Sequence, residues 1–464
     1  MLNTSGGEFV QLLSIAVLAL YVAANLGAND VANSMGTSVG SKALTLRQAI
    51  IVAGILEFTG AVLFGKGVSE TLATGVVNTE VFAAQPQVFL IGMVSVLAAC
   101  GLWLQIATRL GLPVSSSHAV VGAIAGFSSI AAGIGAVDWG TIGTISLTWL
   151  ATPIASGALA TLFYSLVKSS ILDRPDPLVQ MREWIPWLSA ALLSVFGIIV
   201  LPSVVDVAFV QTGAIGFVYD RLGWNIPVHD IVISIGGIGA IVLTQTSWKK
   251  LASSGEKEKQ HDTDLDAQTR IFPVGGHGGT APTEGPHGGW TAIEQQMARF
   301  QVISACFVAF AHGSNDVGNA VAPLAAIAYI QRTGSFPQSD FSVPLWILVL
   351  GGVGIVVGLA IWGKNVIATV GEGIIQLQPS GGFCAELATA ATVLLASRLG
   401  LPVSTSHALV GAVVGVGVVK GWKSVRFQTL LSIGSAWLVT IPIAASLAAG
   451  IFSIVQWILF TYRN

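Results

Sequence analysis

The sequence predicts an all-α polytopic membrane protein with about twelve transmembrane segments, arranged as two related halves. The 464 residues are 53% hydrophobic and only 9% charged, whereas soluble proteins usually contain about 25% charged residues. Apolar runs close to the roughly 20 residues that a membrane-spanning helix requires recur along the whole chain. Polar motifs that occur once in each half predict a duplicated structural unit.

Two polar motifs are repeated. Residues 109–123 and 398–412 agree at 13 of 15 positions, 289 residues apart, and both contain Leu-Pro-Val-Ser-x-Ser-His. Residues 27–33 read Gly-Ala-Asn-Asp-Val-Ala-Asn, and residues 313–319, which lie 286 residues further on, read Gly-Ser-Asn-Asp-Val-Gly-Asn. Because many of the shared residues are polar, hydrophobic patterning does not explain the match. A repeated functional site does.

Twelve apolar segments follow one another along the chain. The first has no convincing cleavage site after it, so we interpret it as a retained span rather than a signal peptide. The fifth and twelfth contain Pro153 and Pro442 at matching positions, which predicts a kink in each helix. The predicted segments are 9–26, 48–65, 88–108, 117–135, 141–168, 185–202, 228–247, 299–312, 343–363, 383–398, 407–421 and 427–460.

The composition divides the chain into four regions. Residues 1–182 form the first transmembrane repeat, 183–248 two connecting helices, 249–298 a hydrophilic linker and 299–464 the second repeat. The linker begins with a Lys/Glu-rich run and continues into Asp-rich and Gly/Pro/His-rich sequence, which predicts a disordered, solvated segment. The net charge of −2 gives no basic surface for nucleic acid. The three cysteines lie in apolar runs, which argues against a disulfide framework.

Lysine and arginine predict the orientation in the membrane. With the linker in the cytoplasm, most of these residues fall on the cytoplasmic side, as the positive-inside rule requires, and both termini lie outside. The two Asn-Asp motifs then leave the membrane on opposite sides. The halves are therefore predicted to have inverted topology, which is typical of secondary transporters whose site lies between the repeats.

The Pro-Val-Ser motifs predict an anion site. Proline breaks or starts a helix, so each motif indicates a broken helix or hairpin whose new N-terminus is lined with hydroxyl groups. Free N–H groups and the helix dipole favour anions there. Arg109 and Arg398, which precede the motifs, either attract anions or anchor the chain at the interface. The candidate anion ligands are Ser115, Ser116, Ser117, Ser404, Thr405 and Ser406.

The Asn-Asp motifs predict a cation site. Carboxylate and amide oxygens spaced i, i+1 and i+4 gather near one helix face, and hard oxygen ligands suit Na⁺, whereas Asp alone can carry H⁺. An ionised Asp at membrane depth costs roughly 2.5–3.5 kcal/mol or more, so such residues are candidates for function. The candidates are Asn29, Asp30, Asn33, Asn315, Asp316 and Asn319.

Four further residues carry titratable groups near these motifs. Glu57 and Glu386 lie within apolar runs at positions that do not match between the copies, and each is either a coupling acid or a paired structural acid. His118 and His407 follow the hydroxyl groups and either help to orient the anion or form hydrogen bonds across the new helix N-terminus.

These motifs resemble those of the inorganic phosphate transporter (PiT) family, over both repeats and in the same order. The resemblance rests on residues 27–37, 113–118, 311–320, 382–386 and 402–407. It implies an inverted-repeat symporter of inorganic phosphate that is neither an enzyme nor dependent on a cofactor. It also implies a multi-pass protein of the cell membrane, often a homodimer, with phosphate on the Ser/Thr motifs and the coupling ion on the Asn-Asp motifs.

The expected function is phosphate import by cation symport through alternating access. The stretch from Met35 to Lys42 resembles the Na⁺-coupled members more closely, so Na⁺ is favoured over H⁺. Alternatives are a carrier of another oxyanion such as sulfate, or an inverted-repeat cation exchanger. An intramembrane aspartyl protease would give no reason for the paired Ser/Thr/His motifs.

Overall fold

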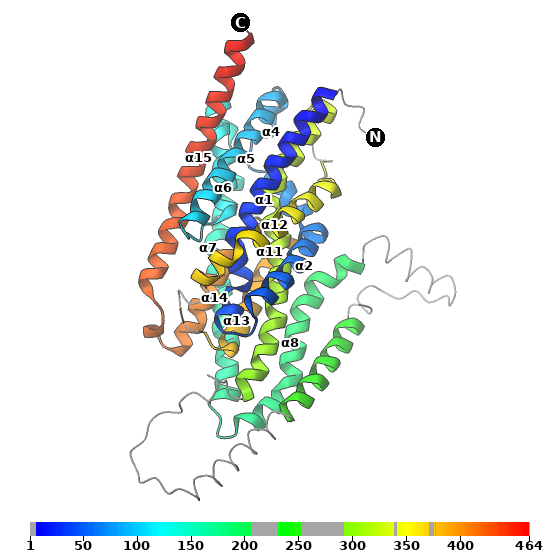
Figure 1. Cartoon of the computed structure of the whole chain (residues 1–464), viewed down its shortest axis with the longest axis vertical. Helices are drawn as coiled ribbons and strands as arrows, with labels where there is room; N and C mark the ends of the chain where they lie inside the picture. The colour runs from blue at the N-terminus through cyan, green and yellow to red at the C-terminus, as the bar shows by residue number, and fades with distance from the viewer. Residues whose placement is uncertain are drawn as a thin grey trace, which may run out of the picture.

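The computed structural model describes residues 6–205, 231, 233–252, 292–337, 341–370, 375 and 377–463. This part of the chain is a bundle of helices without named strands (Figure 1). Eight of its helices are long and apolar enough to cross a membrane, and two shorter apolar helices accompany them. The all-α polytopic fold is confirmed, whereas the number of twelve spans stays a prediction.

The helices follow the predicted segments in order. The predicted segment 228–247 corresponds to a helix over residues 233–252. The named helices are α1 (Gly6–Gly40), α2 (Leu46–Phe64), α3 (Lys66–Thr74), α4 (Thr79–Ala83), α5 (Pro86–Arg109), α6 (Ser116–Ala132), α7 (Trp139–Val167), α8 (Pro177–Val205), α11 (Ala292–Thr333), α12 (Leu345–Val370), α13 (Pro379–Arg398), α14 (Thr405–Lys420) and α15 (Phe427–Arg463).

Two helices extend far beyond the predicted ends. The ends placed at residues 26 and 312 are wrong, because α1 has 35 residues and α11 has 42, and both continue through their Asn-Asp motifs. Their polar side chains find partners on neighbouring helices, so the helix does not have to end where the sequence turns polar. The motifs therefore lie buried within continuous helices. Helix α11 also begins inside the region predicted as linker, and residues 249–252 are helical.

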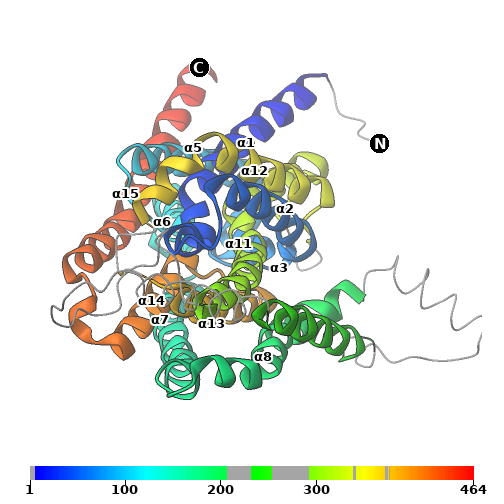
Figure 2. The same cartoon turned by 60° about the horizontal axis from the view of Figure 1, so that its bottom comes forward.

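Helices α1 and α11, which carry the two Asn-Asp motifs, run antiparallel. Asp30 lies 4.0 Å from a ring nitrogen of His312, whereas Ser41, near the end of α1, donates a 2.7 Å hydrogen bond to Gln301. Residue numbers rise along α1 as those of the partners on α11 fall. Figure 2 shows α11 near the centre of the bundle, with α1, α2 and α12 on one side of it and α7, α13 and α14 on the other.

The repeats exchange their packing partners. Helix α1 packs on α12 and α11 on α2, while α6 packs on α15 and α14 on α7. Each half therefore supplies the surface on which the other half packs. Glycines allow α6 to lie close to α15 and α14 to lie close to α7. Gly126 faces the backbone of Ala445, and its repeat partner Gly415 faces that of Gly157.

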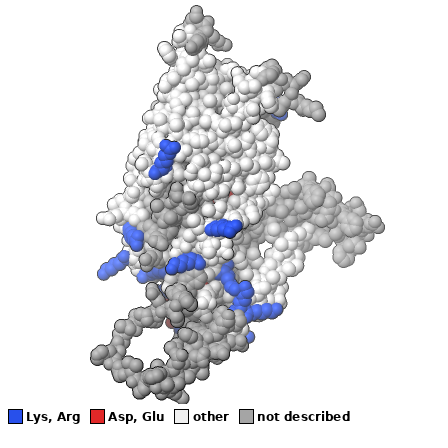
Figure 3. Space-filling view, in the orientation of Figure 1, with Lys and Arg blue, Asp and Glu red and all other residues white. Residues whose placement is uncertain are grey.

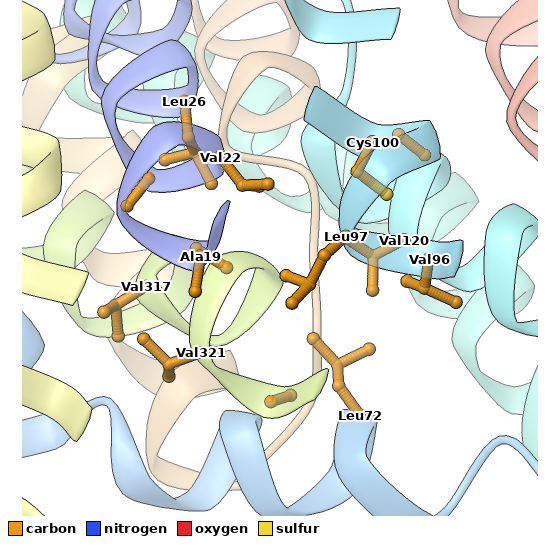
Figure 4. Packing of buried hydrophobic residues seen from close by; sticks show 14 of the residues in the cluster. Ala19, Val22, Leu26, Leu72, Val96, Leu97, Cys100, Val120, Val317 and Val321 are labelled. Carbon is orange, nitrogen blue, oxygen red and sulfur yellow. The ribbon is translucent and has the colours of Figure 1, made fainter. Parts of the chain in front are cut away.

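Apolar side chains fill the space around the polar centre. Figure 4 shows Val22 and Leu26 of α1, Leu97 of α5 and Val317 of α11 close together, and all four are fully buried. The outer surface is also largely apolar, as expected for a bilayer protein. On the face shown in Figure 3, most lysine and arginine side chains lie on the lower half of the molecule.

Alanine at Gly126 or Gly415 should destabilise the protein. The added Cβ would overlap a backbone carbonyl oxygen at either crossing, and overpacking of this kind costs about 1–3 kcal/mol. Thermal unfolding of the purified protein, followed by tryptophan fluorescence, should show a lower melting temperature for each variant. Gly143→Ala is the matched control, because a Cβ there meets no atom within 4 Å. Melting temperatures equal to that of the control would refute the tight crossings.

Candidate functional site

Two helix N-termini meet inside the bundle. Helix α5 ends at Arg109, Gly111 turns the chain with a φ of +66°, and α6 starts at Ser116 after the cap Ser115, whose hydroxyl accepts the N–H of His118. The turn requires this left-handed conformation, which glycine adopts without strain. Gly400, Ser404 and His407 repeat this geometry between α13 and α14. The helix breaks therefore lie at the predicted Pro-Val-Ser motifs. We call the N-terminal ends of α6 and α14, residues 115–118 and 404–407, the two tips.

Each tip bonds to the aspartate of its own half. The Ser116 hydroxyl donates to Asp30 over 3.0 Å, and the Thr405 hydroxyl donates to Asp316 over 2.8 Å. Asn319 adds a bond between the halves, since its amide donates to Ser116 over 3.0 Å. These groups are almost completely buried. The structure therefore brings the predicted anion and cation ligands into one site.

The remaining asparagines of the motifs orient this site. The amide of Asn33 donates to Asp30. The amide of Asn29 donates to Thr108 and to the carbonyl of Leu112, both beside the first tip. Asn315 holds the second tip in the same way, through Ser397 and the backbone of Leu401 and Val403. The side-chain nitrogens thus hold the tips, which leaves the amide oxygens of Asn29 and Asn319 without a partner among the described residues.

His312 lies at the centre of the acidic groups, and the sequence analysis missed it. Its Nε2 lies 2.8 Å from Asp316 and 4.0 Å from Asp30, and its Nδ1 lies 3.1 Å from Glu57. One ligand atom each from Asp30, His312 and Asp316 falls within 4.8 Å of the others. A histidine directly before the repeated Gly313 was the available signal. Repetition does not mark it, because Leu26 stands at the matching position in the first copy.

Glu57 and Glu386 take part in different clusters. Glu57, fully buried, accepts a 2.8 Å hydrogen bond from Ser34 and faces His312. Glu386, also fully buried, belongs to a separate polar cluster between α1, α11 and α13. Its carboxylate accepts hydrogen bonds from Thr37, Ser38, Gln301 and Ser304, at 2.6 to 3.2 Å. Repetition in the sequence does not reveal these four donors, because the matching positions in the other half are not polar.

His118 and His407 link the tips to the long helices of the opposite halves. Nδ1 of His118 bonds to the carbonyl of Trp437, and Nδ1 of His407 to that of Trp149. Each ring also lies against the other tryptophan, with centroids 3.9 and 3.7 Å apart. The Trp149 carbonyl is available because Pro153, four residues later, has no N–H to donate to it.

The site presents both signs of partial charge. Helix N-termini and hydroxyl groups can bind an oxyanion. Buried acceptor oxygens without a partner among the described residues, on Asp316, Glu57, Asn29 and Asn319, can bind a small cation. A helical membrane bundle with such a site is a membrane transport protein.

The comparison with known proteins gives the family. The sequence pattern of the phosphate transporter family matches residues 26–448, and the chain belongs to this family. It is therefore a transporter and not an enzyme.

Similar proteins cover almost the whole chain. It is 40% identical to "Inorganic phosphate transporter 2-1, chloroplastic" of Arabidopsis thaliana, over 94% of this chain and 71% of the relative. It is 36% identical to a "Putative phosphate permease" of Haemophilus influenzae, over 96% of each. A solved structure described as "The sodium-dependent phosphate transporter" matches with a TM-score of 0.77 and 34% identity, over 96% of this chain and 99% of that chain.

Replacing His312 with leucine, the residue of the first repeat, should strongly destabilise the protein. A ring N–H faces a buried carboxylate in either protonation state, and removing one partner of a buried ionic pair costs about 3–5 kcal/mol. The melting temperature should drop markedly.

The double variant His312→Leu/Glu57→Ile should recover part of that loss. Ile355 occupies the corresponding position in the other half, opposite Gly27 as Glu57 is opposite Gly313, so this variant removes an acid that His312→Leu leaves unpaired. A double variant no more stable than His312→Leu would contradict the pairing of Glu57 with His312.

Proposed function

We propose that this protein imports inorganic phosphate together with a cation, Na⁺ in preference to H⁺, by alternating access. The bonds from Ser116 to Asp30 and from Thr405 to Asp316 carry the proposal. They join an anion-binding helix N-terminus to a cation-binding carboxylate, once from each half. Such pairs are expected of a symporter, which must hold both ions together.

Phosphate binds between the two tips in this mechanism. Its oxygens accept hydrogen bonds from backbone N–H groups and hydroxyl groups at both helix N-termini. At each tip two of the hydroxyl groups already contact each other, Ser115 with Ser117 at 3.1 Å and Ser404 with Ser406 at 2.9 Å. The proposed ligands are Ser115, Ser116, Ser117, Ser404, Thr405 and Ser406, with His118 and His407 supporting the tips.

Cations bind first. At roughly 4 Å, two unit charges of the same sign repel by about 4 kcal/mol in a partly solvated site, so a phosphate dianion cannot approach Asp30 and Asp316 unless the carboxylates are neutralised. Na⁺ on the oxygens of the Asn-Asp motifs, with coupling assisted by Glu57 and Glu386, provides this. The resemblance to a solved transporter described as sodium-dependent supports Na⁺.

In this mechanism an inverted repeat allows the site to open to either side of the membrane in turn. The antiparallel course of α1 and α11 and the exchanged helix packing support it. Both described chain ends lie at one end of the molecule (Figure 1), and the visible lysines and arginines gather toward the other end (Figure 3). We therefore place the termini outside, the linker in the cytoplasm and the protein in the cell membrane. The homodimer rests on the family resemblance alone.

Radiolabelled phosphate uptake into proteoliposomes tests the function. Uptake should follow an imposed Na⁺ gradient and persist with excess unlabelled sulfate. Uptake that responds only to an H⁺ gradient would assign the carboxylates to proton transfer. No uptake under either gradient, or full competition by sulfate, would refute phosphate symport.

Asp30→Asn and Asp316→Asn should each reduce Na⁺-driven uptake to background. The amide keeps the shape of the carboxylate but neither binds Na⁺ as strongly nor releases a proton. Glu80→Gln, which neutralises an exposed acid, is the control and should transport normally. Unchanged uptake in both aspartate variants, with unchanged melting temperatures, would remove these acids from the mechanism.

A further inference from the structure

A polar cleft lies beside the first tip. It has a volume of about 530 Å³, and Asn25, Gln105, Thr108, Arg109 and Trp362 contribute to its lining. We call these five residues the approach cleft. They come from α1, α12 and the end of α5, so the cleft lies between the first repeat and a helix of the second.

The approach cleft adjoins the site. The Thr108 hydroxyl accepts the 3.1 Å hydrogen bond from Asn29, next to Asp30 in the Asn-Asp motif. Asn25 lies one helical turn before Asn29 on the same face of α1. A solute in the cleft is therefore separated from the site by little more than the Asn29 side chain and its bonds to the tip.

Arg109 is the charged residue of the cleft. Its side chain is exposed, and no hydrogen bond or ion pair joins its guanidinium group to another side chain within the described ranges. Arg109 is the last residue of α5 and lines the cleft, and its guanidinium group is expected to face water there, because exposure to lipid is costly. Its fork of N–H donors matches the oxygens of a phosphate group.

The second half does not repeat the polar lining of this cleft at the matching described positions. Ala311 and Leu394 stand where the first half has Asn25 and Gln105. The matching arginine, Arg398, donates a 2.7 Å hydrogen bond to the carbonyl of Ile199 on α8. Aromatic rings also cover this side, since Phe310 packs on Phe64 and Phe196, with centroids 5.5 and 5.4 Å apart. One tip therefore faces a polar cleft, while the other lies behind apolar side chains.

We propose that the approach cleft is a transient binding site for inorganic phosphate, in which Arg109 captures the anion on its way to or from the tips. This rests on the proposed function and adds a second, weaker anion site to it. A single cation in a narrow cleft raises the local concentration of anions, an effect that salt screens. Arg398, whose guanidinium is bonded to α8, has no such role.

Thiol labelling tests the cleft without any need for transport. Gln105→Cys is introduced after Cys100, Cys306 and Cys384 have been replaced with alanine, and the protein is reconstituted with the reagent on both sides of the membrane. Two methanethiosulfonates of similar size are compared, one anionic and one cationic. Because residues 105 and 109 are neighbours on one helix face, roughly 6 Å apart, Arg109→Gln should lower the anionic-to-cationic rate ratio about tenfold. Arg398→Gln is the matched control and should leave the ratio unchanged.

Phosphate should slow the reaction of the anionic reagent with the thiol introduced at position 105, and this protection should disappear in Arg109→Gln. In uptake assays the Michaelis constant for phosphate should rise severalfold in Arg109→Gln and less in Arg109→Lys, with the maximal rate within about twofold of normal. The effect should shrink at high ionic strength.

Three results would overturn the proposal. Failure of both charged reagents would show that residue 105 does not face water. A rate ratio that Arg109→Gln leaves unchanged would show that Arg109 does not attract anions into the cleft. Absence of phosphate protection would show that phosphate does not bind there. Because labelling needs no uptake, a protein that shows charge selection and phosphate protection but transports no phosphate would refute symport and leave the approach cleft standing.

Discussion

The structure depends on the burial of ionisable groups at the centre of a membrane protein. Asp30, Asp316, Glu57 and His312 are all almost fully buried, and each would be costly in this place without a partner. The helices that supply the partners must therefore hold their positions closely. The unbroken course of α1 and α11, the capped tips and the glycine crossings all serve this end, because they fix the backbone from which the polar side chains reach one another.

The scaffold repeats, but its charges do not. Hydroxyl groups, asparagines and aspartates occur once in each half with nearly the same bonds. Glu57, His312 and Glu386 stand where the other half has Ile355, Leu26 and Leu97. A symmetric pair of tips suits a site that opens to either side in turn. Glu57 and His312 make this site chemically asymmetric, Glu386 adds a separate acidic cluster beside it, and we propose that these residues serve the coupling ion.

This division also explains what the sequence could and could not predict. Repetition in the sequence identified Ser116, Thr405, Asp30 and Asp316, and the structure joins them in pairs. It could not identify His312 or the donors around Glu386, because residues that break a repeat leave no second copy to compare. The ends of α1 and α11 were missed for a different reason. A polar run usually ends a membrane segment, but here partners on other helices satisfy it.

The exchanged packing has a consequence for how such a protein arises. Each half depends on the other to bury some of its helix faces, since α1 and α6 pack on helices of the second half and α11 and α14 on helices of the first. With the inverted topology that we propose, a single unfused half would need another copy of itself as a partner, inserted in the opposite orientation. In a fused chain the two halves are always synthesised together, so each has its partner. Each half can then acquire residues that the other lacks.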